Sequence, residues 1–310
     1  MRIVITGGSG LIGAALAREM GEAGHEVVVL SREPSRVKSL PPNTRAVYWE
    51  GKWEGKWDGR TAGDWAKLLD EDTAIVHLAG DGVASGRWTD EKKKRIRDSR
   101  VESGQAVAAA IRQATAKPRA LLQGSAVGYY GDCGDEVVEE PHRPGDDFLA
   151  RVCVEWEAST AEVEALGVRR PVLRTGIVLS KEGGALPRMA LPFRMLAGGP
   201  LGNGRQWVPW IHAADEVGAI RFLIENDTAT GPFNLTAPAP LTNRDFSRAL
   251  GRVLSRPSFA PAPGFALRFL LGEMADAVLN GQRAVPRRLL ELGYKFRFPE
   301  AAGALGELLG

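Results

Sequence analysis

The sequence opens with MRIVITGGSGLIG, residues 1–13, and this stretch decides the fold. Its apolar first half predicts a short buried strand, which turns on glycines into a helical pattern that continues to Met20. Gly7 permits the tight turn, Gly10 lets a pyrophosphate approach the backbone without meeting a Cβ, and Gly13 lets the helix pack close to the strand. The free N–H groups at the helix start then face the phosphates. The stretch therefore predicts a dinucleotide-binding turn, with the spacing G-x-x-G-x-x-G in place of the usual G-x-G-x-x-G.

The bulk composition is that of an ordinary globular protein, with 310 residues, 44% hydrophobic, 25% charged and a net charge of +2. This balance points neither to nucleic acid nor to an anionic membrane as a partner. No apolar run approaches the ~20 residues of a membrane helix, and the first residues already belong to a core strand, so we expect no signal peptide. Two cysteines and four scattered histidines exclude a disulfide framework and a metal site. A reduced, cytoplasmic setting is favoured.

Strands and helices alternate along the first 180 residues. After the first strand, further strands are predicted at 26–30, 46–49, 73–78, 120–123 and 172–179, and helices at 14–23, 91–113 and 148–166. This rhythm predicts an α/β protein with a Rossmann-type doubly wound parallel sheet. A short tandem repeat, EGKWEGKW at 50–57, is interpreted as an exposed loop or hairpin.

The end of the second strand indicates which dinucleotide is bound. Enzymes that choose NAD place an Asp or Glu there, which accepts a hydrogen bond from the ribose 2′-OH. This chain has Ser31 and Arg32 instead, and a hydroxyl and a guanidinium suit a 2′-phosphate. The pattern favours NADP(H) over NAD(H), although an arginine that follows a strand is also common on protein surfaces.

The amino-acid composition of the sequence changes after Ser180. The chain becomes rich in glycine and proline and carries two closely spaced tryptophans, which indicates loops and short helices that line a site. We therefore expect an NADP-binding Rossmann domain at 1–180 and a smaller α-rich substrate lobe at 181–310. Residues near 211–236 are candidates to return to the first domain.

Several motifs resemble one known family. The glycine turn, HLAG at 77–80 and SAVGYYG at 125–131 resemble the extended short-chain dehydrogenases/reductases. Longer motifs resemble its atypical "epimerase family" branch, often described as sugar-nucleotide epimerase-like. They are FLARVCVEWE from 148, RTGIVLSKEGGALPRM from 174, PFRMLAGGPLGNGRQWVPWIH from 192 and LNGQRAVPRRLLELGYKFRFP from 279.

This resemblance implies a Rossmann domain with a C-terminal substrate lobe, and it implies a set of cofactor contacts. Arg100 is similar in place to a cofactor-facing polar residue, and Leu179 is expected near the nicotinamide. The helix at 91–113 pairs subunits in many relatives, so a homodimer is expected by analogy. The cofactor contacts implied are Gly7, Ser9, Gly10, Leu11, Ile12, Gly13, Ser31, Arg32, Leu78, Ala79, Gly80, Arg100 and Leu179.

The catalytic pair of that family is missing. Typical members use a Ser or Thr together with Tyr-x-x-x-Lys, where the ammonium lowers the pKa of the phenol one helical turn away. In the helix where the pair belongs, the candidate registers give Phe148 with Val152, or Leu149 with Cys153. None of these side chains can transfer a proton in the required way.

Three residues are candidates to act in place of the pair. Ser125 either hydrogen-bonds a substrate or caps the strand end. Tyr130, or its neighbour Tyr129, could act as an acid or could be a buried aromatic with a satisfied hydroxyl. His212 has an ordinary pKa near neutrality, and its alternative role is a bond to Asp215 at a helix start.

Two functions stay open at this point. One is an NADP(H)-dependent oxidoreductase or epimerase that acts on a small polar substrate. The other is a catalytically inactive NADPH-binding sensor or scaffold. The missing pair favours the sensor, whereas a polar, tryptophan-bearing second lobe favours the enzyme. The residues expected to grip a polar or anionic substrate there are Arg194, Gln206, Trp207 and Trp210.

Overall fold

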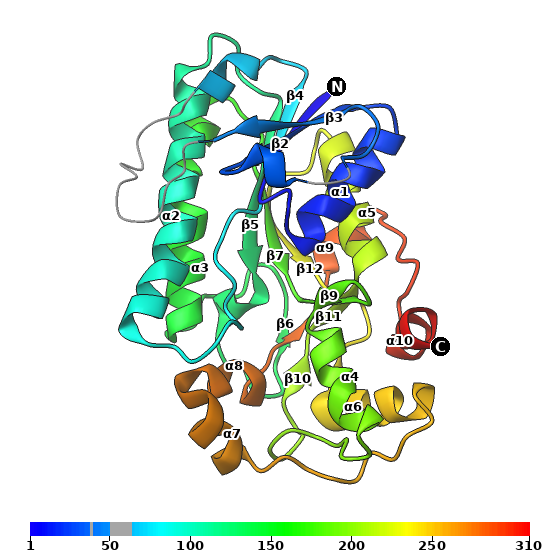
Figure 1. Cartoon of the computed structure of the whole chain (residues 1–310). Helices are drawn as coiled ribbons and strands as arrows, with labels where there is room; N and C mark the ends of the chain where they lie inside the picture. Colours follow the sequence, from blue (N-terminus) through cyan, green and yellow to red (C-terminus); the bar gives the residue numbers. More distant parts are fainter. Residues whose placement is uncertain (38–39, 50–63) are drawn as a thin grey trace.

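The computed structural model describes residues 1–37, 40–49 and 64–310, so the EGKWEGKW segment lies outside the described residues. A seven-stranded sheet has the order β12-β7-β5-β4-β1-β2-β3, and every neighbouring pair is parallel (Figure 1). The strands are β1 Arg2–Thr6, β2 Glu26–Ser31, β3 Thr44–Tyr48, β4 Thr73–His77, β5 Ala120–Ala126, β7 Pro171–Thr175 and β12 Gly231–Leu235. The predicted doubly wound Rossmann-type sheet is confirmed.

Helices cover both faces of this sheet. Helices α1 (Leu11–Glu22) and α5 (Ala213–Glu225) lie on one face, and α2 (Asp90–Gln113) and α3 (Phe148–Ala158) lie on the other (Figure 1). Successive residues of a strand point to opposite faces. The central strands are therefore apolar on both sides, which explains their continuous hydrophobic runs.

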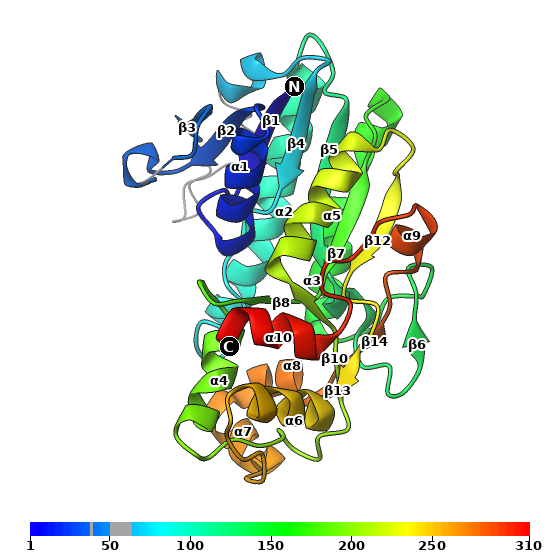
Figure 2. The same ribbon diagram turned by 90° about the vertical axis from the view of Figure 1, so that its right-hand side faces the viewer.

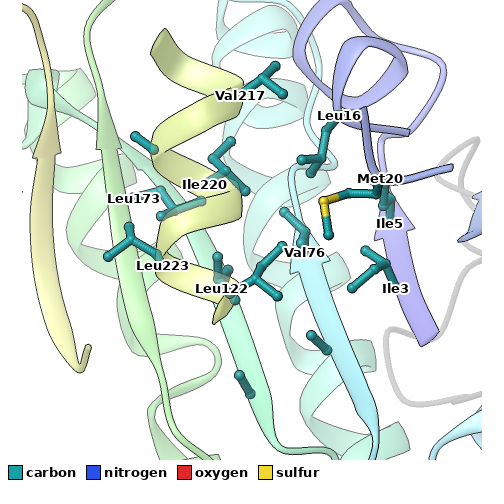
Figure 3. Packing of buried hydrophobic residues seen from close by; sticks show 14 of the residues in the cluster. Ile3, Ile5, Leu16, Met20, Val76, Leu122, Leu173, Val217, Ile220 and Leu223 are labelled. Carbon is teal, nitrogen blue, oxygen red and sulfur yellow. The ribbon is translucent and has the colours of Figure 1, made fainter. Parts of the chain in front are cut away.

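Figure 3 shows the packing under α1 and α5. Ile3 and Ile5 of β1 meet Leu16 of α1 and Ile220 of α5 in one cluster between the sheet and these helices, and all four side chains are fully buried. Val4, between them in the strand, joins the cluster on the opposite face. The order of the strands reverses at β1, which has β2 on one side and β4 on the other. In doubly wound sheets, ligands bind in the crevice at that reversal.

A smaller lobe, called here the C-terminal lobe, lies beyond the carboxyl ends of the central strands (Figure 2). Its core includes Trp210, Phe246, Leu250 and Leu305. Among the described residues, every helix is too short or too polar to cross a membrane. The elements of this lobe are α4 Leu186–Arg194, β10 Trp207–Val208, β13 Leu241–Thr242, α6 Asn243–Val253, α7 Gly264–Leu271, α8 Asp276–Leu279 and α10 Ala301–Leu309. The predicted α-rich C-terminal lobe is confirmed.

Short strands and one more helix connect the two parts. Strand β8 pairs with β11 and β9, and β6 pairs with β14. These elements bring the chain back and forth between the large sheet and the C-terminal lobe. Their bounds are β6 Val137–Val138, β8 Ile177–Ser180, β9 Gly183–Gly184, β11 Trp210–His212, β14 Arg283–Ala284 and α9 Arg287–Glu291.

The single strand predicted at 172–179 is wrong, because the chain changes sheets at Gly176. Strand β7 ends at Thr175 in the large sheet, and β8 starts at Ile177 in a separate three-stranded sheet. The N–H of Gly176 bonds to Leu235, whereas the N–H of Ile177 bonds to Pro209. A Cβ at position 176 would lie 2.2 Å from the Pro209 oxygen, so only glycine fits this crossing.

The continuous helix predicted at 148–166 is also wrong. Helix α3 ends at Ala158, and a separate 3₁₀ segment runs from Ala161 to Leu166. The Ser159 hydroxyl donates to the Trp156 carbonyl at 2.6 Å, and the Thr160 hydroxyl donates to the buried Gln123 side chain at 2.8 Å. These side-chain bonds compete with the helical pattern and end the helix there.

Candidate functional site

The glycine turn, called here the cradle, packs closely against main-chain atoms at Gly7 and Gly13. Gly7 has φ +71°, and a Cβ there would lie 2.8 Å from the Leu78 oxygen. A Cβ at Gly13 would lie 2.4 Å from the Gly7 oxygen, so this glycine lets α1 pack directly on the turn. Gly10 is the N-cap of α1, which has neither a side-chain cap nor an acidic residue in its first turn. The first N–H groups of α1 are therefore left for an outside acceptor, and an anion suits them.

The other residues predicted in this turn lie around the cradle. Ser9 is exposed at the turn, and Ile12 packs partly against the core on the α1 side. Leu11 lies against β9, because a Cβ at Gly184 would be 3.0 Å from its Cδ2 atom. Leu11 thus connects the start of α1 with the segment after β8.

Leu78, Ala79 and Gly80 lie directly across from the glycine turn. The Thr6 hydroxyl oxygen accepts from the N–H groups of Leu78 at 3.1 Å and Ala79 at 3.2 Å. His77 Nδ1 lies 2.7 Å from the same oxygen. Burial lowers the pKa of His77 to about 3, so this histidine is a neutral part of the scaffold.

Ser31 is the last residue of β2, and Arg32 directly follows it. The Ser31 hydroxyl accepts from the N–H of Glu33 at 3.2 Å, which shapes a local turn. Arg32 is exposed and forms no hydrogen bond or ion pair with any residue that the structure describes. Its guanidinium therefore keeps its full set of donors for a ligand.

Arg100 of α2 lies between the β4 turn and α3. Its Nη1 donates to the carbonyl oxygens of Asp81 and Ile96, both at 2.9 Å, and its guanidinium lies 5.1 Å from the Trp156 ring. A Cβ at Gly80 would lie 2.9 Å from the Arg100 Cζ atom, so the glycine makes room for it. Among the described residues, the cation is thus held by main-chain oxygens and an aromatic face.

A closed polar network occupies the carboxyl ends of β5 and β7. Ser125 donates to Glu157 Oε1 at 2.6 Å, and Arg174 binds the same carboxylate at 2.9 and 3.0 Å. Arg174 also donates to the Tyr130 hydroxyl at 3.1 Å, which in turn donates to Asn234 Oδ1 at 2.6 Å. Every member is buried or nearly so. These hydrogen bonds join β5, α3, β7 and β12.

The two tyrosines of this region differ. Tyr130 is 2% exposed, its hydroxyl both donates and accepts, and burial raises its pKa to about 12. Tyr129 is half-buried, and the Arg174 guanidinium lies 3.5 Å from the centroid of its ring. The phenol with the more accessible position is therefore that of Tyr129.

The proposed bond between His212 and Asp215 is wrong. His212 Nδ1 accepts from the N–H of Ala214 at 3.0 Å, so its Nε2 carries the proton and faces Glu307 at 3.0 Å. Asp215 instead accepts from the N–H groups of Arg297 at 2.7 Å and Phe298 at 2.9 Å. Both side chains fasten the C-terminal segment to the start of α5.

The predicted substrate residues of the C-terminal lobe separate into two groups. Trp210 is fully buried in the core and Arg194 is exposed in the last turn of α4. Trp207 donates to Asp135 at 2.9 Å, and Gln206 lines a cleft of about 470 Å³. The cleft is lined by Asp132, Gly134, Asp135, Gly202, Asn203, Arg205, Gln206, Gly264, Arg268, Leu279, Asn280 and Gly281. Leu179 is fully buried in β8.

Some residues of the site were missed from the sequence. Arg174 is an arginine inside an apolar strand, and Glu157 closes the FLARVCVEWE motif, so each offered a signal in its polarity. Glu216 offered less, since an acidic residue in the first turn of a helix is ordinary. It is fully buried beside Thr175, which donates to it at 2.8 Å, and burial raises its pKa to about 8.

Together, the parallel sheet, its reversal at β1 and the uncapped glycine turn define a Rossmann-type α/β protein. The model of the NAD dependent epimerase/dehydratase family matches residues 3–236, and the chain belongs to that family. A second model, a domain of unknown function (DUF1731), matches residues 262–308 in the C-terminal lobe. The resemblance found from the sequence motifs is confirmed.

Similar proteins align with almost the whole length of the chain. Epimerase family protein Mb2239 of Mycobacterium bovis is 40% identical over 305 residues, which cover 98% of this chain and 96% of the relative. Epimerase family protein YfhF of Bacillus subtilis is 36% identical over 310 residues, covering 100% and 98%. The crystal structure of human epimerase family protein SDR39U1 (isoform 2) with NADPH has a TM-score of 0.85 at 33% identity, covering 100% of this chain and 99% of that one.

Proposed function

We propose that the chain binds NADP(H) and is an oxidoreductase- or epimerase-like protein for a small polar substrate. The observation that carries the proposal is the pairing of the uncapped glycine cradle at α1 with the free Arg32 guanidinium after β2. The cradle suits a pyrophosphate because the start of α1 has no side-chain cap and the turn is built from glycines, which carry no Cβ. Arg32 fits a 2′-phosphate by charge and fork geometry. The similar human protein was solved with NADPH.

We assign the cofactor side of the site to the residues that surround this cradle. The N–H groups of the first turn of α1 bind the pyrophosphate, and Leu78, Ala79 and Gly80 form the opposite wall. Ser31 and Arg32 bind the 2′-phosphate. Bound NADP(H) supplies hydride transfer at the nicotinamide.

Arg100 supplies the cation that the missing lysine would have given. Cys153 stands in the register of that lysine, and the Arg100 charge acts on it, although burial dominates and raises the pKa of Cys153 to about 11. A thiol with that pKa is neutral at pH 7 and cannot replace an ammonium. We therefore propose that Arg100, reaching in from α2, holds the cofactor ribose.

The catalytic roles of Ser125, Tyr130 and His212 are kept as proposals with a direct test. Protein loaded with NADPH is mixed with aldehydes, ketones, quinones and nucleotide sugars, and the absorbance of the reduced nicotinamide is followed. We expect turnover of one class, reduced at least about tenfold in Tyr130→Phe or His212→Ala if either moves a proton. Titrations of NADPH and NADH into the same protein test the cofactor, and equal affinity for the two would contradict the role of Arg32.

A binding protein without catalysis is the second candidate. The specific observation in its favour is the closed network, in which Ser125 and Arg174 both donate to Glu157 and Tyr130 is bonded to Arg174 and Asn234. No turnover of any substrate class by protein that binds NADPH tightly would decide for this sensor or scaffold. Turnover that survives in both Tyr130→Phe and His212→Ala would decide for an enzyme with other catalytic groups.

A further inference from the structure

The C-terminal lobe has an unusual distribution of charge. Residues 186–210 and 241–272 contain eight arginines and no lysine, and Asp245 is their single acidic residue, whereas the whole chain is nearly balanced with 40 basic and 38 acidic residues. The arginines are Arg188, Arg194, Arg205, Arg244, Arg248, Arg252, Arg256 and Arg268. Such a one-signed field raises the local concentration of anions.

Three of these arginines surround one hollow. It has a volume of about 590 Å³ and lies between the 200–205 loop, the first turns of α6 and the segment at 258–261. None of the described residues that line it is acidic. Its lining residues are Pro200, Gly202, Asn203, Arg205, Arg244, Arg248, Ser258, Phe259 and Pro261.

The arginines are positioned by the local structure. Arg244 and Arg248 are one turn apart on α6 and therefore share a helix face. Arg244 Nη2 donates to the Asn203 carbonyl at 3.0 Å, and Arg248 Nη1 lies 3.2 Å from Asp245 Oδ1. The guanidinium of Arg205 forms no hydrogen bond or ion pair with the described part of the chain. Three cations that face one hollow thus share a single neighbouring carboxylate.

Two further features of the hollow point to a ligand. The Ser258 hydroxyl is buried without a hydrogen-bond partner among the described residues. Phe259 is 71% exposed at the rim, where its ring offers an apolar surface beside the charges. A buried donor without an acceptor costs stability unless a ligand or water supplies one.

We propose that this hollow binds a phosphate-bearing ligand, a phosphomonoester or a diphosphate with an adjoining apolar group. Guanidinium forks pair with phosphate oxygens through two parallel hydrogen bonds. Arg205, Arg244 and Arg248 bind the phosphate, Ser258 donates to it, and Phe259 contacts the apolar group. The site is separate from the glycine cradle, since α6 lies at the end of the molecule opposite the N-terminus and no lining residue belongs to the cradle (Figures 1 and 2).

Inorganic pyrophosphate is the first probe, titrated by calorimetry into protein already saturated with NADPH, so that the cradle cannot take it up. We expect saturable binding that weakens at least about tenfold in Arg244→Gln/Arg248→Gln. Arg252→Gln is the matched control, because Arg252 is exposed on the same helix but does not line the hollow. Absence of binding both to pyrophosphate and to the phosphatidic acid vesicles described next, or an equal loss in the control, overturns the proposal.

A second arm separates a free phosphate ligand from a lipid headgroup. The three proteins are sedimented with phosphatidylcholine vesicles, with and without phosphatidic acid. Binding that needs both phosphatidic acid and the arginine pair assigns the site to a lipid phosphate, and pyrophosphate binding alone assigns it to a free one. Pyrophosphate binding that disappears in Gly10→Val but survives in the arginine variant places the probe in the cradle and overturns the proposal.

Discussion

At the carboxyl edge of the sheet, polar groups on one side lack hydrogen-bond partners among the described residues, whereas those on the other side have them. Beside β1 and β2, the start of α1 has no side-chain cap, and Arg32 bonds to nothing that the structure describes. Beside β5 and β7, the side chains of Ser125, Arg174 and Tyr130 all bond to one another or to Glu157 and Asn234. One side is open to a ligand, and the other is closed.

This difference has a simple physical basis. Buried polar groups need partners, so a network far from water must satisfy itself. Donors at the rim of a crevice can reach water and can exchange it for a ligand at little cost. We therefore infer that the polar groups of the open side are available to bind a ligand. Those of the closed side mainly stabilise the fold.

The largest expected effect breaks the closed side. Arg174→Met removes the cation between Glu157 and Tyr130 and leaves a buried carboxylate without its partner. We expect the free energy of unfolding to fall by about 3–5 kcal/mol in denaturant titrations, with NADPH affinity unchanged where the protein is folded. Arg112→Met is the control, because its pair with Glu162 is exposed and worth less than about 1 kcal/mol. Equal losses in the two variants would contradict a closed network.

The next effect blocks the open side. Gly10→Val adds a side chain where the pyrophosphate approaches, at a residue that is exposed and has an ordinary extended conformation. We expect NADPH affinity to fall about 100-fold, or about 2.7 kcal/mol, with little change in melting temperature. Gly303→Ala in α10, where a Cβ meets nothing within 4 Å, should leave binding intact. Unchanged affinity in Gly10→Val would place the cofactor elsewhere.

Glu216 gives the closed side a pH dependence. Because burial raises its pKa from 4.5 to about 8, the folded protein holds this proton more tightly than the unfolded chain does. The contribution of Glu216 to the free energy of unfolding is therefore fully present below pH 4.5. It is lost as the pH rises to about 8, by on the order of 1 kcal/mol per pH unit. Between pH 4.5 and about 8, the stability of Glu216→Gln relative to the wild type should therefore increase with that slope. Unfolding experiments at several pH values measure it. Parallel curves, like those expected for the exposed Glu22→Gln, would show that Glu216 is not buried.

Much of the fold could be predicted from the sequence. The apolar runs of β1, β2 and β4 and the glycine turn are local signals, and all lie close to the predicted ranges. The breaks at Gly176 and after Ala158 were not predictable in this way. They depend on Pro209 and on Gln123, residues more than thirty positions away that only the fold brings near.

The candidate site likewise has a part that local sequence predicts and a part that depends on distant residues. The cradle residues are contiguous in sequence, so their geometry follows from glycine spacing. The partner of His212 is Glu307, 95 residues further on, and the partners of Tyr130 are Arg174 and Asn234. A motif can suggest such side chains, but it cannot say whether their hydrogen bonds are already satisfied.

The most direct test of the central claim is the ratio of NADPH to NADH affinity in the wild type and in Arg32→Glu, measured by fluorescence titration of the reduced nicotinamide. If the uncapped cradle and the free guanidinium hold this cofactor, NADPH binds the wild type more tightly than NADH does. The substitution then weakens NADPH about tenfold or more, with NADH nearly unchanged. An unchanged ratio, or equal binding of the two cofactors by the wild type, would contradict the account.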